Sequence, residues 1–429
     1  MVSSWNRLPV LRPPARQVPL VCRYDRLPRA EQGGLLAHGN GRSYGDVCLN
    51  EDGTLLMARG LDRFIDFDPA SGRLVCEAGV LLADILELIV SRGWFLPVTP
   101  GTRMVTVGGA IANDVHGKNH HDAGTFGDHV RAISLRRSSG QCLELNRTDH
   151  PELFAATVGG LGLTGLIVAA ELQLVAIDSP FMQVQSQRFA NLDEFFAINA
   201  EAEKNWPYTV AWVDCLGGGR GRGIYFSARH IKMPEKPPHF RDRQRRMPVD
   251  PPFSLVNGLS LKLFNNMYYH QPLKAEAVSH YQPYFYPLDG LLDWNRIYGR
   301  RGFYQYQCVL PPENRRQGVQ MLLDRIADSG QGSFLAVLKT FADRPSPGML
   351  SFARPGVTLA LDFPNLGERT LALFASLDSI VTEAGGALYP AKDARMSAAM
   401  FQRGFPRWDE FAAYIDPAFS SSFWRRVTE

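Results

Sequence analysis

The stretch PVTPGTRMVTVGGAIANDVHGKNHHDAGTFGDHV, from Pro97 to Val130, holds more glycine, histidine and small polar residues than a packed core needs. Gly108-Gly109-Ala110 offers backbone that a flat or anionic group can approach closely, because glycine has no Cβ. The run from Asn113 to His121 then brings amide and titratable side chains. Two interpretations are open: a solvated surface loop or a ligand-binding loop. A zinc site is disfavoured, and no metal is predicted, because cysteine pairs and a helical His-x-x-x-His are absent.

Length and composition indicate an ordinary globular protein. A chain of 429 residues is too long for one core, which favours two domains. The net charge of +3 argues against nucleic acid as a partner. Six scattered cysteines without a Cys-x-x-Cys pair predict free, mostly buried thiols in a reducing compartment.

Targeting signals are not evident. The first twenty residues carry prolines and arginines where a signal peptide needs an apolar core. No apolar run reaches 18 residues, so no membrane span is predicted. The expected location is the cytoplasm.

A second glycine-rich loop follows a short predicted strand over residues 34–37. Its sequence, GNGRSYGD from Gly39 to Asp46, offers backbone amides that can bind a phosphate. It lacks the spacing and the Lys-Ser/Thr of a P-loop. A plain glycine-rich turn is the alternative.

The segment from Gly159 to Gly165 contains a formal Gly-x-Gly-x-x-Gly. A dinucleotide fingerprint needs a strand before the glycines and a helix after them. Here residues 151–157 have a helical pattern and residues 166–174 alternate like a strand, so the order is reversed. We therefore disfavour nicotinamide binding at this site. Other first-half predictions are strands at 54–57 and 73–78, a helix at 81–92 and a hairpin at 131–145.

From about Asp178 the chain becomes rich in aromatic residues and alternating segments. These predict an antiparallel domain, with strands at 208–213, 223–226, 304–310, 335–339 and 357–363 and helices at 192–204, 312–328 and 370–385. Residues 229–246 carry seven Lys/Arg against two acids, and prolines flank them. We expect a mobile loop over 229–252. It is either a solvated surface or a contact for anionic lipid.

Polar residues interrupt several predicted strands of this domain. Gln305 and Gln307 share one face of their strand, as do Thr358 and Ala360 of theirs. Lys339 ends an apolar strand, and Lys392 lies in the sequence LYPAKDAR. A polar ligand would explain these residues, but a sheet edge and a surface ion pair would also do so.

Six segments together resemble the vanillyl-alcohol-oxidase-type FAD flavoproteins: GNGRSYGD, PGTRMVTVGGAIANDVHGKNHH, GGLGLTG, YQYQ, VLK and LYPAKDAR. They occur in the family's order and span nearly the whole chain. The resemblance implies an α+β fold of two domains, with a PCMH-type FAD domain over residues 1–178 to which 387–429 return. An antiparallel substrate domain over 179–386 would be inserted between them.

The resemblance also implies which residues bind FAD. The pyrophosphate would lie on the Gly39–Asp46 loop and the Thr106–Gly109 turn, the flavin ring near Asn113 to His116 and Tyr389, and the adenine end near Ile167 and Val168. The full set is Gly39, Asn40, Gly41, Arg42, Ser43, Tyr44, Gly45, Asp46, Gly101, Thr106, Val107, Gly108, Gly109, Asn113, Asp114, His116, Gly117, Ile167, Val168 and Tyr389. Many members bond their flavin to a histidine where this chain has Arg42, which predicts non-covalent FAD.

Within this family, the chain resembles one branch more closely than the others. That resemblance implies that the 2′-hydroxyl of a polyprenylphosphoryl ribose, such as decaprenylphosphoryl ribose, is oxidised to a ketone. This is the first half of an epimerisation to the arabinose donor for cell-envelope polysaccharide. Lys392, His116 and Tyr44 match catalytic positions, with Lys392 as base or as cation. The matching substrate positions are Lys118, Gln305, Gln307, Lys339, Thr358 and Ala360. Relatives carry Asn and Cys at the last two, which leaves the sugar and the lipid length open.

Implied partners are the lipid-linked sugar and a short-chain NAD(P)-dependent reductase of the ketone. Peripheral contact with the inner membrane through the basic loop is also expected. An aldonolactone or alditol oxidase acting on a soluble sugar is the alternative enzyme. A non-enzymatic role is disfavoured because Lys392 and the Gly108-Gly109 pair are intact.

Overall fold

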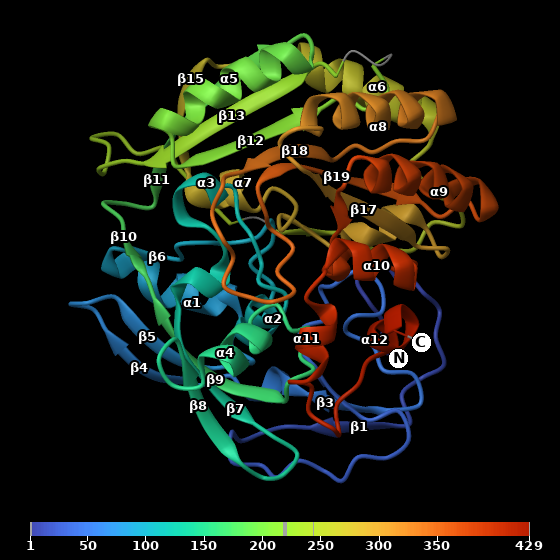
Figure 1. Cartoon of the computed structure of the whole chain (residues 1–429). Coiled ribbons are helices and arrows are strands. Elements are labelled where there is room, and N and C mark those ends of the chain that lie inside the picture. Colours follow the sequence, from blue (N-terminus) through green and yellow to red (C-terminus); the bar gives the residue numbers. More distant parts are fainter. Residues whose placement is uncertain (1, 218–220, 243, 429) are drawn as a thin grey trace.

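The computed structural model describes residues 2–217, 221–242 and 244–428. Two large antiparallel sheets organise these residues (Figure 1). The first has the strand order β4-β5-β9-β7-β8. Its strands are β4 (Phe64–Asp68), β5 (Arg73–Glu77), β7 (Val130–Arg136), β8 (Cys142–Asn146) and β9 (Leu166–Gln173). This part of the chain also forms the small parallel sheet β1-β3-β2, with β1 (Arg16–Pro19), β2 (Leu35–His38) and β3 (Thr54–Met57).

The second large sheet has eight strands in the order β15-β11-β13-β12-β18-β19-β17-β20. They are β11 (Phe181–Phe189), β12 (Tyr208–Val213), β13 (Gly223–His230), β15 (Glu276–His280), β17 (Phe303–Leu310), β18 (Ala336–Phe341), β19 (Gly356–Pro364) and β20 (Ala387–Leu388). The two-stranded sheets are β6 (Trp94–Phe95) with β10 (Val175–Ala176) and β14 (Arg245–Arg246) with β16 (Leu291–Leu292).

Helices cover one face of the eight-stranded sheet and leave the other toward the first sheet (Figure 1). On the covered face Tyr306 of β17 packs against Phe374 of α9, with 5.2 Å between ring centroids. The covering helices are α5 (Leu192–Asn205), α8 (Arg315–Ser329) and α9 (Glu368–Glu383). The others are α1 (Leu82–Ile89), α2 (Val107–Ala112), α3 (His120–Ala123), α4 (Pro151–Thr157), α6 (Gly258–His270), α7 (Tyr281–Phe285), α10 (Ala398–Gly404), α11 (Trp408–Ala412) and α12 (Ser422–Thr428).

The last segment of the chain contacts the first part. Phe419 pairs with Leu35 in a parallel bridge, and Ser420 N donates to Leu35 O at 3.0 Å. Phe401 and Phe411 are fully buried. The proposed domain division rests on this contact and on the separation of the two large sheets.

The predicted elements are confirmed at nearly all their positions. The order α4, glycines, β9 supports the rejection of a nicotinamide fingerprint. The six cysteines are free, with three buried and Cys142 exposed. None of the helices in the described ranges is long and apolar enough to cross a bilayer.

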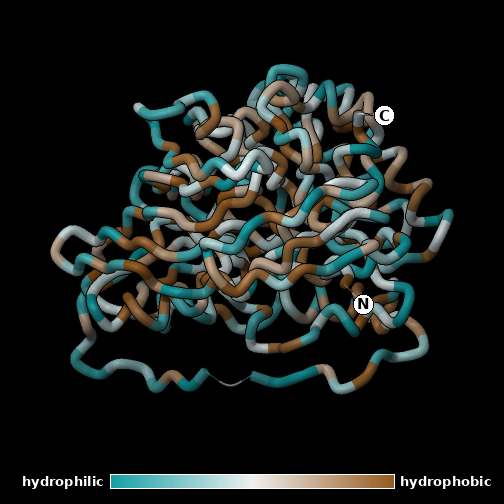
Figure 2. Tube along the Cα trace, turned by 90° about the horizontal axis from the view of Figure 1, so that it is seen from below, coloured by the Kyte–Doolittle hydropathy of each residue, from teal (hydrophilic) through white to brown (hydrophobic). Residues whose placement is uncertain are grey.

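The structure differs from the predicted basic loop at the start of that loop, because strand β13 extends to His230. The rest is a mostly hydrophilic strap along the lower edge of Figure 2, and Arg243 lies outside the described residues. The strap is held by the pairing of β14 with β16 and by side-chain contacts that include Arg103 Nη2 to Asp242 at 2.5 Å, Arg7 to Asp250 at 2.8 Å, and Phe240 stacked on His280 at 4.1 Å. Its mobility stays a prediction.

Candidate active site

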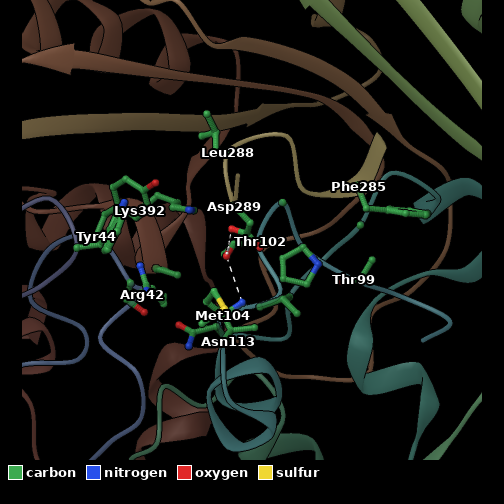
Figure 3. Close-up of a pocket in the computed structure, with 18 of the residues that line it drawn as sticks. Arg42, Tyr44, Thr99, Thr102, Met104, Asn113, Phe285, Leu288, Asp289 and Lys392 are labelled. Carbon is green, nitrogen blue, oxygen red and sulfur yellow. Dashed lines mark hydrogen bonds between the residues drawn. The ribbon is translucent and has the colours of Figure 1, made fainter. Parts of the chain in front are cut away.

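A cavity of about 950 Å³ lies between the glycine-rich loops of the first part and the open face of the eight-stranded sheet. Figure 3 shows that Lys392 and Tyr44 lie together at one end of the view, with Phe285 and Thr99 at the other. The cavity is therefore assembled from segments far apart in sequence.

The loop after β2 lines the cavity from Gly39 to Tyr44. Its turn requires Gly45, which has a φ of +83° and would place a Cβ 1.6 Å from the Asp393 carbonyl oxygen. The next residue, Asp46, is buried and accepts from Arg426 Nη2 at 2.7 Å. Gly45 and Asp46 therefore hold the loop in place and do not line the cavity.

The turn at Thr106 lies against this loop. A Cβ at Gly39 would lie 2.5 Å from Thr106 Oγ1, so glycine permits the approach. Thr106 Oγ1 accepts from Gly109 N at 3.1 Å and begins α2. Gly108 N donates to Ala78 O at 2.8 Å, which ties α2 to the strand end before α1.

Two buried polar atoms in this wall have no hydrogen-bond partner among the described residues: Arg42 Nε and Asn113 Oδ1. The Arg42 guanidinium packs over the Trp5 ring, 4.1 Å from its centroid, and burial lowers the pKa of Arg42. Buried polar groups are normally paired. An anion suits Arg42 and an N–H donor suits Asn113, so the wall fits a dinucleotide such as FAD.

The opposite wall is one face of three neighbouring strands. In the register of β17, β19 and β18, Gln305 is opposite Asp362, Gln307 opposite Ala360, and Lys339 opposite Thr358. All six residues line the cavity. Gln305 Nε2 donates to Asp362 at 2.6 Å, while Gln305 Oε1 is buried without a partner in the described chain. That oxygen can accept from a ligand hydroxyl.

His116 connects the two walls. Its Nε2 lies 3.0 Å from Gln307 Nε2, and its Nδ1 lies 3.2 Å from Lys339 Nζ. Burial, followed by the charge of Lys339, lowers the pKa of His116 well below its usual value. His116 is therefore a neutral imidazole between Gln307 and Lys339, and its one unprotonated ring nitrogen accepts from one of these two donors.

Lys392 ends a short 3-10 helix (Pro390–Lys392), and its Nζ lies 3.9 Å from the centroid of the Tyr44 ring. Enclosure in the cavity lowers the pKa of Lys392 to about 8, against the charge of Asp362, which raises it. Burial raises the pKa of Asp362 to about 7. The lysine can therefore exchange a proton near neutral pH.

Two further lysines face the same space. Enclosure, followed by the charge of a neighbouring lysine, lowers the pKa of Lys118 and of Lys339 to about 7. Lys339 Nζ donates to Gly117 O at 3.0 Å, and Lys118 Nζ donates to Tyr284 O. A bound anion would raise both pKa values and favour the charged lysines.

The other predicted residues divide into two groups. Gly101, Gly117, Ile167 and Tyr389 line the cavity. Tyr389 donates to Asn113 O at 3.1 Å. Asp114, Val107 and Val168 are buried away from it. Asp114 accepts from Gly127 N at 2.9 Å and from Ser351, which makes it a support for the loop.

Sequence reasoning missed Asp362, which lies two residues beyond Ala360 on the same face of β19. Extending the alternation of Thr358 and Ala360 by one step would have found it. It also missed Asp289, which accepts from Thr102 Oγ1 at 2.6 Å. No local pattern marks that residue. Within the described ranges, no group of three or more His, Cys, Asp or Glu is arranged to hold a metal.

Comparisons with known proteins agree with the cavity. Residues 23–146 match a protein family described as FAD binding domain. A decaprenylphosphoryl-β-D-ribose oxidase of Mycolicibacterium smegmatis is 35% identical over 93% of this chain and 90% of that protein. An uncharacterized protein of Streptomyces coelicolor is 33% identical over 81% of this chain and 100% of that protein. An L-gulonolactone oxidase of Mus musculus is 27% identical over 39% of this chain and 38% of that protein.

Proposed function

Because this chain belongs to the decaprenylphosphoryl-β-D-ribose oxidase family of FAD-dependent oxidoreductases, we propose that it oxidises the 2′-hydroxyl of a polyprenylphosphoryl ribose to the 2′-ketone. FAD is its cofactor. The observation that carries the proposal is one cavity that joins two walls: a glycine-loop wall, where Arg42 Nε and Asn113 Oδ1 have no partner among the described residues, and a polar sheet face bearing Lys339 and Asp362.

In this proposal Lys392 accepts the proton of the substrate hydroxyl. A lysine with a pKa of about 8 is partly neutral at physiological pH and regains the ammonium form after the transfer. Gln305 Oε1 and the Gln307 amide orient the sugar hydroxyls from the sheet. FAD, when bound, supplies the oxidation by accepting the hydride.

Lys118 and Lys339 form the proposed subsite for the substrate phosphate. They lie on facing walls of the cavity, and both have depressed pKa values that an anion would restore. These two lysines would bind the phosphate of an ester without a lipid as well as that of a lipid-linked ester. The lipid must therefore be recognised elsewhere.

We propose that FAD is bound non-covalently because Arg42 occupies the position of the flavin-linking histidine. The Arg42 guanidinium packs over the Trp5 ring and is not a nucleophile for the flavin ring. Acid precipitation should release all the flavin into the supernatant. Flavin retained in the pellet would contradict this part of the proposal.

The ketone product calls for a second enzyme, which we propose is a short-chain NAD(P)-dependent reductase acting on the same lipid. The basic strap over residues 229–252 is proposed to face anionic lipid at the inner membrane. The enzyme would then work at the bilayer surface, where its substrate is held.

The decisive experiment is anaerobic reduction of the bound flavin, followed by its visible absorbance. Polyprenylphosphoryl ribose should bleach the flavin, and ribose 5-phosphate and free ribose should not. Bleaching by L-gulono-1,4-lactone and not by the lipid-linked sugar would instead favour the soluble-sugar oxidase, to which the more distant L-gulonolactone oxidase points.

A further inference from the structure

Helix α6 exposes an apolar stripe that is unusual for a surface helix. Leu259, Leu263 and Met267 recur every four residues, and they are 79%, 61% and 63% exposed. The buried face carries Leu261 and Asn265, and Asn265 Nδ2 donates to Asp214 at 2.9 Å. A helix that presents such a stripe to solvent needs a non-aqueous partner on that stripe.

The surface around α6 is apolar and positively charged. Phe253 and Leu255 precede the helix and are 71% and 44% exposed. Residues 251–275 contain no Asp or Glu, whereas Lys262 and Lys274 are exposed. We call Phe253, Leu255, Leu259, Leu263 and Met267 the α6 face.

The cavity reaches the same helix at its apolar end. Next to the polar residues of β17, β18 and β19, the same sheet face continues with apolar pairs. Val337 lies opposite Trp212, and Val210 lies opposite Phe226. Tyr268 of α6 packs edge-on against Trp212, with 4.8 Å between ring centroids, and both line the cavity. The helix that carries the α6 face thus also forms a wall of the cavity's apolar end (α6 is labelled in Figure 1).

We propose that the α6 face inserts into the surface of an anionic lipid bilayer and that the lipid tail of the substrate enters the cavity from there. This inference rests on the proposed function for the identity of the tail. A helix of 13 residues is about 20 Å long and lies in the plane of the interface. The lysines meet the lipid phosphates while the apolar stripe meets the acyl chains.

A second copy of this chain fits the α6 face less well than lipid does. A two-fold interface would set the same patch against itself, with Lys262 and Lys274 facing lysines and with no acid in residues 251–275 to pair them. Anionic lipid supplies the missing negative charge. Self-association is therefore an outcome that the experiment must be able to report.

The test is sedimentation of the FAD-loaded protein with vesicles of phosphatidylglycerol and phosphatidylcholine. One variant combines Leu259→Ser, Leu263→Ser and Met267→Ser. The matched control combines Val10→Ser, Met321→Ser and Leu366→Ser, which change exposed apolar residues elsewhere. We expect the control to bind like the wild type and the α6 variant to bind at least about tenfold more weakly. Equal binding of the α6 variant, or no binding of the wild type, would overturn the proposal.

Two further readouts separate the possible failures. The α6 variant should keep its flavin and oxidise a water-soluble short-chain polyprenylphosphoryl ribose at the wild-type rate, but lose activity on long-chain substrate in vesicles. Wild-type oxidation of the short-chain substrate without vesicle binding would reject the α6 face and leave the proposed function standing. A dimer in light scattering that only the α6 variant abolishes, without vesicle binding, would assign the face to self-association and also reject the proposal.

Discussion

At the residue scale, the proposed chemistry depends on a lysine that is enclosed in the cavity and forms no direct ion pair within the described ranges. Lys392 packs over Tyr44, and enclosure brings its pKa to about 8. Lys392→Met keeps the approximate volume but cannot accept a proton. We expect the rate of flavin reduction by substrate to fall by about 10²- to 10⁴-fold, with FAD content unchanged. Stopped-flow absorbance measures this rate, and a loss below threefold would exclude Lys392 as the base.

The carboxylate of Asp362 sets where Lys392 titrates. Its negative charge raises the pKa of the lysine, so Asp362→Asn should lower that pKa below about 8. In the proposed mechanism the neutral lysine is the base, so the rate of flavin reduction rises with pH through this pKa. The rising limb of the pH profile should therefore move to lower pH, by about one unit or more. Asp193→Asn, on the exposed surface, should leave the profile in place, and a shift to higher pH for Asp362→Asn would contradict the assignment.

Gly45 is the residue that the FAD loop tolerates least well when changed. Gly45→Ala combines a left-handed φ of +83° with a Cβ 1.6 Å from the Asp393 carbonyl oxygen. We expect a loss of at least about 3 kcal/mol in the free energy of unfolding, together with loss of FAD. Gly140→Ala provides the control, since Gly140 has a φ of +90° but nothing within 4 Å of its Cβ. Gly140→Ala should lower the free energy of unfolding by only about 1–2 kcal/mol in urea titrations. Equal losses for Gly45→Ala and Gly140→Ala would show that the contact with Asp393 does not determine the effect.

Among the elements, α12 connects the end of the chain to the glycine loop and to the segment that carries Lys392. Arg426 donates to Asp46 of the glycine loop and to Asp393, the neighbour of Lys392. Arg426→Met would remove the cation that pairs with these two buried carboxylates, which costs about 3–5 kcal/mol. Thermal unfolding and flavin release should report this loss. Arg407→Met, at the residue before α11, breaks only an exposed pair with Glu410 and should change the melting temperature little.

The sequence predicted elements and segments better than it predicted side-chain direction. Alternation placed Gln305, Gln307, Thr358 and Ala360 on the sheet face, and strand register then brought them together. The FAD motifs located their loops, but a motif does not say which side chains face inward. This explains why Asp114, whose side chain bonds within the loop, is not at the cavity.

Other features depend on contacts that no local pattern encodes. The pairing of Asp46 with Arg426 joins residues 380 positions apart. Helix α6 has its apolar stripe outside, contrary to the rule by which a stripe is read as core. A sequence-based assignment would have buried Leu259 and Leu263 together with Leu261, which is the one leucine of the helix that is buried.

At the scale of the whole molecule, FAD bound as proposed would be a structural link between the two large sheets. The cavity walls come mainly from the first 118 residues, from Leu161 to Ile167, from the eight-stranded sheet, from Tyr268 of α6, from residues 283–294 and from the segment 389–392. In this proposal FAD binds the folded state and not the unfolded chain. Removing FAD should lower the free energy of unfolding by about 2.7 kcal/mol relative to protein with free FAD at 100 times its Kd, and by about 4.1 kcal/mol relative to 1,000 times. Urea titrations at graded FAD concentrations measure this dependence.

Riboflavin provides the matched ligand for that titration, because it carries the flavin ring without the diphosphate. Arg42 Nε is buried without a partner in the described chain, so the anion should contribute a large share of the binding energy. Riboflavin should then stabilise the protein less than FAD at equal concentration, and Arg42→Gln should reduce the difference between the two ligands. A midpoint independent of FAD, or equal stabilisation by riboflavin, would mean that the glycine-loop wall does not bind the diphosphate. The link between the sheets would then have to come from the flavin ring alone.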